Sequence, residues 1–262
     1  MGDVPVANAT FMFNMDDMYP EYLPDLNVLV CPVDAGMSVD DLINPVTEAF
    51  DAHVKCAGGT RGWTLTDESY VYLGHTFDKA TDSDPTIPLG ALRATDQACE
   101  RTNAFAPTER VGTQIAAWLA YFRAGIATDP AGFVTAVDGD WDIGDEIKVG
   151  GIDFNSAASA EYIGNGNNSI LRRLRNGITR FLILDNPPDE VDPRAQIESE
   201  CMVMWEQAGL TRQLAVGFNH SPGGSNVLYI DGHVDFVKYS THDKPPLNRT
   251  SILTTQCMQT ER

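Results

Sequence analysis

Residues 218–239, FNHSPGGSNVLYIDGHVDFVKY, carry the clearest structural signal in this chain. Two runs rich in β-forming residues flank the Asp231-Gly232 pair, a combination typical of a hairpin with a two-residue turn. We therefore expect residues 226–230 and 233–238 to pair as antiparallel strands. A hairpin at this position favours a mainly antiparallel sheet, with residues 216–240 as its C-terminal part.

Side chains alternate along a strand, so the second run is expected to have two different faces. Val234 and Phe236 share one face, which we expect to pack on the core, and His233 and Asp235 share the other. We expect the polar face to be exposed to solvent.

The same stretch also supplies residues for chemistry. A metal site would use the ligand-type side chains of His220, Asp231, His233 and Asp235. A catalytic set of His220, Asp231 and either Ser221 or Ser225 is the weakest interpretation, because residues close in sequence rarely reach triad geometry. We rank the hairpin first, a metal site second and catalysis third.

Composition limits the function classes. The chain has 262 residues, 43% of them hydrophobic, enough for a buried core. Its 37 acidic residues outnumber 18 basic ones, and the net charge of -19 disfavours binding to nucleic acid or to anionic membranes. No apolar run reaches the roughly 20 residues of a membrane span, so the sequence as given predicts a soluble protein.

The remaining patterns predict a single α+β domain over residues 1–262. The clearest helix follows the N-cap Thr108 and ends at Gly125, with a buried apolar stripe. A helix end over 8–18 and a helix from Ser38 are also expected. Strands are expected at 27–32, 69–77, 178–184 and 201–206, and a short basic helix before Gly177.

An acidic segment, DGDWDIGDE, places Asp138, Asp140 and Asp142 at alternate positions. Carboxylates so arranged can wrap a Ca²⁺ ion, which prefers six to eight oxygen ligands. The spacing departs from an EF-hand, and a solvated loop is the competing interpretation. Motifs of hydrolases, zinc proteases and nucleotide-binding loops are absent from the sequence.

Four blocks of the sequence resemble prepilin-like proteins. They are MYPEYLPDLNVLVCPVDA (18–35), SYVYLGHT (69–76), NSILRRLRNGITRFLILDNP (168–187) and the opening stretch. Proteins of this family carry an N-terminal cleavage and methylation signal and a C-terminal H-x(9)-D-G processing-associated domain. The chain departs from that pattern in three ways: ten residues separate His220 from Asp231, Val33 stands where a serine is expected, and the hydrophobic N-terminal helix is missing.

The resemblance implies a fold and a function. The fold would be a truncated N-terminal helix packed on an antiparallel sheet with decorated loops. The function would be that of an exported head domain, periplasmic or at the cell surface, in a type II secretion pseudopilin or type IV pilus-like assembly. Its partners would be other pilin-like subunits or secretion components, and membrane contact would come only through the missing helix. Calcium, which major pseudopilins commonly bind, would then be held by Asp138, Asp140 and Asp142 or by Asp231.

Two further expectations complete the sequence-based picture. A secreted hydrolase or glycan-acting enzyme on the same scaffold is the alternative function, since fold does not fix function. Five cysteines without a C-x-x-C pair argue against a zinc knuckle or a thioredoxin-type site. In an exported protein, Cys31 and Cys56 are the preferred disulfide pair.

Overall fold

The computed structural model describes most of the chain, in segments. The described residues are 11–34, 37–44, 46–48, 50, 53–55, 62–64, 69–95, 105–128, 138–143, 148–149, 152–153, 163–182, 198–210, 216–220, 223–239 and 244–256.

Within these segments the chain alternates short helices and strands. The α-helices are α1 (Met15–Met18), α2 (Leu89–Thr95), α3 (Thr113–Thr128) and α7 (Arg249–Gln256). The 3-10 helices are η1 (Leu26–Leu29), η2 (Val39–Leu42), η6 (Asn165–Asn167) and η7 (Ile178–Phe181). The strands are β1 (His53–Lys55), β2 (Gly62–Thr64), β3 (Tyr70–Tyr72), β4 (Thr86–Pro88), β5 (Arg110–Gly112), β6 (Trp141–Asp142), β7 (Lys148–Val149), β8 (Ile152–Asp153), β9 (Ile170–Leu171), β10 (Met202–Glu206), β11 (Gly209–Leu210), β12 (Val216–Gly217), β13 (Gly224–Tyr229) and β14 (Val234–Lys238).

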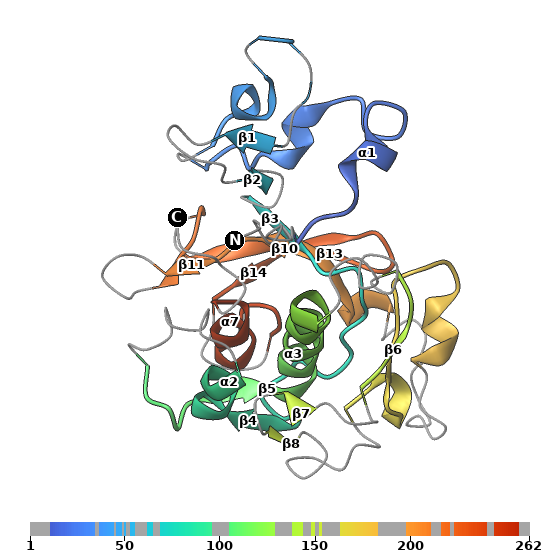
Figure 1. Cartoon of the computed structure of the whole chain (residues 1–262), viewed down its shortest axis with the longest axis vertical. Helices are drawn as coiled ribbons and strands as arrows, with labels where there is room; N and C mark the ends of the chain where they lie inside the picture. Colours follow the sequence, from blue (N-terminus) through green and yellow to red (C-terminus); the bar gives the residue numbers. More distant parts are fainter. Residues whose placement is uncertain are drawn as a thin grey trace, which may run out of the picture.

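A four-stranded antiparallel sheet in the order β14-β13-β10-β3 forms the centre of the molecule (Figure 1). The other described strands pair two by two, also antiparallel. This mixture of helices with antiparallel sheet confirms the α+β class.

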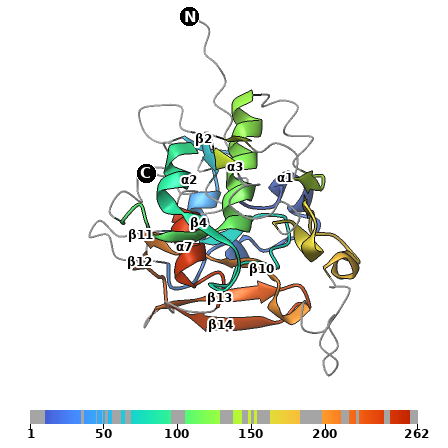
Figure 2. The ribbon, with the colours of Figure 1, turned by 90° about the horizontal axis from the view of Figure 1, so that it is seen from below.

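The main core lies on one face of this sheet, against α2, α3 and α7 (Figures 1 and 2). We call it the inner cluster; its central members are Val71, Ile115, Trp118, Leu119, Trp205 and Val227. The helix that contributes most to it is α3, from the middle of the chain. The apolar stripe expected for this helix is therefore core, because Ile115 and Leu119 are fully buried.

The N-terminal part of the chain packs on the opposite face, over β3 and β10 (Figure 1). Its buried residues form the N-terminal cluster, made of Met12, Met15, Leu26, Leu29 and Leu42. This cluster contacts Tyr70, Tyr72 and Met204, whose side chains project from the sheet on that side. Two strands thus separate two apolar clusters.

The predicted hairpin is present, although its turn and its faces differ from expectation. Leu228 pairs with Val234, and the N–H of Gly232 donates to the carbonyl of Tyr229 at 3.0 Å. The connection is thus one residue longer than expected, and Gly232 takes a positive φ of 88°, as in a three-residue loop closed by a bulge.

The expectation that Val234 and Phe236 face the core is wrong. They are 61% and 36% exposed, whereas Val237 is buried. The reason is the register, in which Val237 lies opposite Ser225 and joins the face that packs on the helices. A one-residue difference in assignment moves every side chain of a strand to the other face.

Several other expectations need correction. Residues 27–32 do not form a strand, because Asp25 caps the 3-10 helix η1 through the N–H of Asn27. The helix α3 begins at Thr113 rather than after Thr108 and runs past Gly125 to Thr128, since residues 110–112 form β5. The basic segment before Gly177 contains β9 rather than a helix. Of the strand expected over 178–184, residues 178–181 form the 3-10 helix η7, and residues 183–184 lie outside the described residues.

Candidate functional site

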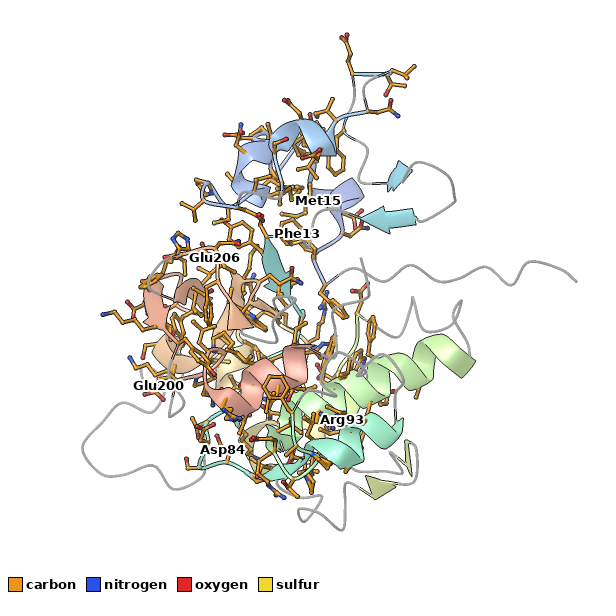
Figure 3. All side chains as sticks on the ribbon, turned by 90° about the vertical axis from the view of Figure 1, so that its left-hand side faces the viewer. Phe13, Met15, Asp84, Arg93, Glu200 and Glu206 are labelled. Atoms are coloured by element: carbon orange, nitrogen blue, oxygen red, sulfur yellow. The ribbon has the colours of Figure 1, made fainter. Side chains whose placement is uncertain are left out.

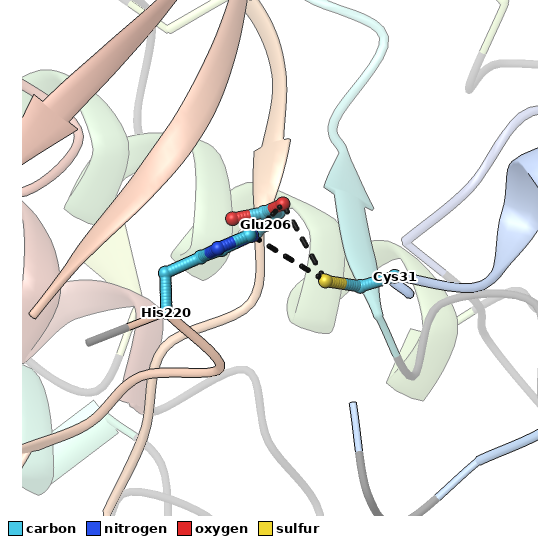
Figure 4. Close-up of side chains that lie close together, drawn as sticks. All are labelled: Cys31, Glu206 and His220. Atoms are coloured by element: carbon cyan, nitrogen blue, oxygen red, sulfur yellow. Dashed lines mark hydrogen bonds and ion pairs between the residues drawn. The ribbon is translucent and has the colours of Figure 1, made fainter. Parts of the chain in front are cut away.

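Three ligand-type side chains from distant parts of the sequence meet beside the sheet (Figure 4). The Sγ of Cys31 lies 3.6 Å from Oε1 of Glu206 and 3.6 Å from Nε2 of His220. The same Nε2 lies 2.8 Å from Oε1 of Glu206. Among the described residues, this is the single group of three or more His, Cys, Asp or Glu ligand atoms that lie within 4.8 Å of one another.

Each member is positioned by a different element. Cys31 follows η1 and begins a turn in which its carbonyl accepts from the N–H of Asp34 at 2.9 Å. Glu206 is the last residue of β10, on the face that contacts the N-terminal cluster (Figure 3). His220 precedes β13 and forms a bridge with Gly224. The cluster thus lies where the N-terminal part of the chain meets the sheet.

Burial distinguishes the three residues. Cys31 and Glu206 are 1% and 3% exposed, whereas the side chain of His220 is 26% exposed. One side of the cluster is therefore reached by solvent through His220, and the thiol and the carboxylate are enclosed. The ring of His220 also packs edge-on against Phe236, with centroids 5.7 Å apart.

Asn226 satisfies the buried carboxylate of Glu206. Its backbone N–H donates to Oε2 at 3.0 Å and its side-chain Nδ2 donates to Oε1 at 2.8 Å. The hydroxyl of Ser225 accepts from the backbone N–H of Glu206 at 2.9 Å. These bonds fix the direction in which Glu206 presents Oε1, as outer partners do for ligands of a metal.

The surroundings favour the protonated, neutral forms of Cys31 and Tyr70. Burial raises the pKa of the Cys31 thiol, and the nearby Glu206 carboxylate raises it further. Burial likewise raises the pKa of Tyr70 to about 12, with added contributions from Cys31 and Glu206. A cation placed here would reverse this preference for Cys31, because positive charge stabilises the thiolate.

The geometry does not match a cysteine–histidine–glutamate catalytic triad. In a triad, one ring nitrogen faces the nucleophile and the other is held by the carboxylate. Here a single nitrogen, Nε2 of His220, contacts both Cys31 and Glu206. Three ligand-type atoms within 4.8 Å of one another could instead hold a metal ion.

The described residues proposed from sequence for catalysis or metal binding do not gather with His220, and Ser221 lies outside the described residues. Asp231 lies in the hairpin turn, at the far end of β13 from His220, and its Oδ1 is 2.6 Å from Nδ1 of His233. The Ser225 hydroxyl bonds to backbone groups of Glu206 and Asn226. Asp235 pairs with Val227 in mid-strand. The structure therefore brings His220 together with Cys31 and Glu206 instead.

The acidic segment proposed for calcium lies elsewhere and has basic neighbours. Asp140 contacts Arg172 at 3.0 Å and Arg175 at 2.9 Å, and it accepts from the backbone N–H of Arg173 at 2.9 Å. Partial burial alone would raise the pKa of Asp140, but these hydrogen bonds and charges lower it.

The other two carboxylates of this segment differ in their surroundings. Asp138 contacts Arg173 at 3.2 Å and is 75% exposed in its side chain. Asp142 belongs to β6 and pairs with Ile170. Arginines from residues 172–175 thus supply positive charge that the sequence-based argument assigned to Ca²⁺, and calcium binding stays a prediction.

Sequence reasoning missed two members of the cluster. Cys31 was considered only as half of a disulfide; it is a free, buried thiol, and its expected partner Cys56 lies outside the described residues. Glu206 was read only as the end of a strand. A carboxylate that continues the apolar run CMVMW was the available signal, because such a residue is rarely buried without a partner.

A second feature is a surface cavity, lined by Asp82, Thr108, Glu109, Arg110, Arg249 and Thr250. Arg249 and Glu109 form a two-pronged ion pair there, with bonds of 2.7 and 3.0 Å. None of these residues belongs to the Cys31 cluster.

Comparisons with known proteins do not identify a family: no family model, curated protein or solved structure matches this chain. Among the residues that the structure describes, no helix combines the length and the apolar character needed to cross a membrane.

Proposed function

We propose that this chain is the exported head domain of a pilin-like subunit and that it acts by binding neighbouring subunits. The pilin-like fold is part of this proposal. The helix end expected over residues 8–18 is present only as the four-residue α1, because residues 11–14 are not helical and residues 8–10 lie outside the described residues. The observation that carries the proposal is the open edge of the central sheet. Along that edge, β14 exposes apolar side chains.

The outer edge of β14 presents both backbone groups and side chains that another chain could contact. The N–H of Tyr229 donates to His233, and the N–H of Tyr239 donates to Gly223, so the odd-numbered residues of β14 bond to β13. Val234, Phe236 and Lys238 therefore direct their backbone groups away from β13. Among the described strands, β13 is the one partner of β14, which lies at the outer edge of the sheet (Figure 2).

An exposed edge with apolar side chains favours association. Unpaired backbone groups on an edge strand can be extended by a strand of another chain. Val234 and Phe236 add apolar surface beside those groups. A subunit of an exported assembly needs such a contact surface, whereas a protein that acts alone usually protects its edges.

The four blocks that carry the resemblance contact one another, which also supports the proposal. Ser69 donates to Asp34 at 2.9 Å, and Thr76 donates its N–H to the carbonyl of Arg172 at 3.0 Å. Cys31 contacts His220. Residues that are similar to one family thus lie together rather than scattered.

The alternative, a secreted hydrolase or glycan-acting enzyme, has less support. Its expected set of His220, Ser225 and Asp231 is not assembled, because Ser225 bonds to backbone and Asp231 lies in the hairpin turn. No observation here favours a particular substrate.

Photo-crosslinking in the source cells tests the proposal. A photoreactive amino acid replaces Phe236, and the control replaces Val46, which is 88% exposed in the N-terminal part. We expect position 236 to capture an exported pilin-like subunit or secretion component and position 46 to capture it less. Crosslinks to cytoplasmic proteins alone, or recovery of the chain in the cytoplasmic fraction, would count against the proposal.

A further inference from the structure

We propose that Cys31, Glu206 and His220 bind one Zn²⁺ ion, which links the N-terminal part of the chain to the central sheet. This site is independent of the proposed function, since it requires no partner subunit. It also differs from the calcium site expected from the sequence in position and in ligand chemistry.

The distances between the donor atoms match a tetrahedral ion. Zn–S bonds of about 2.3 Å and Zn–N or Zn–O bonds of about 2.1 Å, at tetrahedral angles, place S about 3.6 Å from N and from O. The Cys31 sulfur lies 3.6 Å from both the His220 nitrogen and the Glu206 oxygen. Two of the three distances between donor atoms thus match those of a zinc site without rearrangement.

The third donor–donor distance, between His220 and Glu206, is shorter than a shared ion requires. Nε2 of His220 and Oε1 of Glu206 lie 2.8 Å apart, whereas ligands of one zinc ion lie about 3.4 Å apart. A hydrogen bond explains the shorter distance, because a proton joins the two atoms. An ion would replace that proton and separate the atoms by roughly half an ångström.

Charge also favours a divalent cation. A Cys31 thiolate and the Glu206 carboxylate cancel the charge of Zn²⁺ when His220 is neutral. Such a neutral complex suits a site where Cys31 and Glu206 are almost fully buried. On binding, the thiol of Cys31 releases its proton to solvent, and neutral His220 gives up the proton on Nε2 and takes one up on Nδ1, so one proton is released in all. Sulfur, nitrogen and oxygen each donate an electron pair to the ion without any change of oxidation state.

The donor set selects among metals. Thiolate and imidazole ligands favour Zn²⁺, whereas Ca²⁺ prefers oxygen ligands alone. The three protein ligands leave a fourth position for water, on the side where His220 is partly exposed. Asn226 holds Glu206 in place by two hydrogen bonds and so acts as a positioning residue.

The ion would join parts of the chain that are otherwise held by packing and by hydrogen bonds such as that from Ser69 to Asp34. Cys31 belongs to the N-terminal part, Glu206 ends β10 and His220 precedes β13. Glu206 lies 175 positions after Cys31 in the sequence, and His220 lies 189 positions after it. A link between such distant positions restricts the unfolded chain and therefore stabilises the fold.

The test uses the full chain, reduced and freed of metal by a chelator, then titrated with Zn²⁺ and separately with Co²⁺. We expect one equivalent of Zn²⁺ to bind, a higher melting temperature, and a thiolate-to-cobalt charge-transfer band. Ca²⁺ should not displace Co²⁺. Cys31→Ser should abolish the band and weaken Zn²⁺ binding by about 100-fold or more.

Cys201→Ser is the matched control. Cys201 is equally buried and free, but its Sγ contacts the carbonyl of Phe77, so this variant should bind like wild type. If Cys31→Ser does not fold, His220→Asn at the partly exposed member replaces it and should weaken binding at least about 10-fold. A folded, reduced wild type without the cobalt band overturns the site, as does zinc binding that survives loss of Cys31 or His220.

Discussion

The indole N–H of Trp118 donates to Nδ1 of His75 at 3.1 Å, and both residues are 2% exposed. Nε2 of His75 lies 3.2 Å from the carbonyl of Gly139. A neutral imidazole that carries its proton on Nε2 satisfies both contacts. A second proton on Nδ1 would face the Trp118 donor, with the carbonyl of Leu73 as an acceptor 3.3 Å away. Burial is the larger effect and favours neutral His75.

Stability should therefore fall as the solution is acidified. Burial lowers the pKa of His75 from 6.5 to about 4, with a further lowering by Arg173, while carbonyl contacts and Asp140 raise it. Between those values the unfolded chain binds a proton that the native protein excludes, so the free energy of unfolding falls by about 3 kcal/mol from pH 6.5 to pH 4. Above pH 6.5 this contribution is constant.

Urea unfolding at several pH values measures this loss. His75→Gln should be less stable at pH 7.5 but should lose less stability on acidification. Phe77→Leu, at a buried position in the same core, should lower stability about equally at every pH. Parallel acid profiles for wild type and His75→Gln would show that other groups cause the loss.

Asp140→Asn should destabilise the protein by about 1 to 3 kcal/mol, because it removes charge-assisted hydrogen bonds from Arg172, Arg173 and Arg175. Asp138→Asn, at the more exposed carboxylate, should cost less than about 1 kcal/mol. Thermal unfolding in CaCl₂ and in chelator checks both variants. We expect the Asp140→Asn loss in both solutions; a loss confined to CaCl₂ would indicate the calcium site instead.

Gly224→Ala should destabilise the hairpin by about 1 to 3 kcal/mol through overpacking. An added Cβ would lie 2.6 Å from Cζ of Phe236 and 2.7 Å from the carbonyl oxygen of Val237. Gly112→Ala is the control, since its Cβ would meet nothing within 4 Å, and its effect should stay within about 0.5 kcal/mol. Equal unfolding midpoints for the two variants in urea would contradict the close approach of β13 and β14.

Glu206→Gln, measured in chelator, should lower the free energy of unfolding by about 1 to 3 kcal/mol. The new amide group would place a donor beside the donors of Asn226 and His220 that now bond the carboxylate. Glu109→Gln, at the more exposed pair with Arg249, should cost about 1 kcal/mol or less. A larger loss for Glu109→Gln would mean that the buried carboxylate contributes little.

Local patterns predicted the parts of the fold that local interactions determine. The hairpin follows from Asp231-Gly232 between β-forming runs, and the strand at 201–206 corresponds to β10. The apolar spacing of Ile115 and Leu119 predicted the helix that packs on the sheet. Its start at Thr113 was missed because the pairing of β5 with β4 takes residues 110–112, and that pairing depends on a distant segment.

The site depends still more on distant contacts. No spacing rule connects Cys31 with Glu206 and His220, because the sheet order and the packing of the N-terminal part bring them together. The same limit affected the acidic segment, whose arginine neighbours lie more than thirty positions away at Arg172 and Arg175. Even the faces of β14 required knowledge of which side of the sheet the helices cover.

Phe11 connects the N-terminal part of the chain mechanically to the central sheet and to α3. Its carbonyl accepts from the N–H of Tyr72 at 2.7 Å, and its ring packs on Trp118 and Phe122 of the inner cluster, with centroids 6.0 and 5.6 Å away. Tension applied at residue 11 would therefore reach α3 and the sheet directly, before it reaches the N-terminal cluster. Force spectroscopy on Phe11→Ala should record a lower rupture force than on wild type, and an equal force would show that the load passes elsewhere.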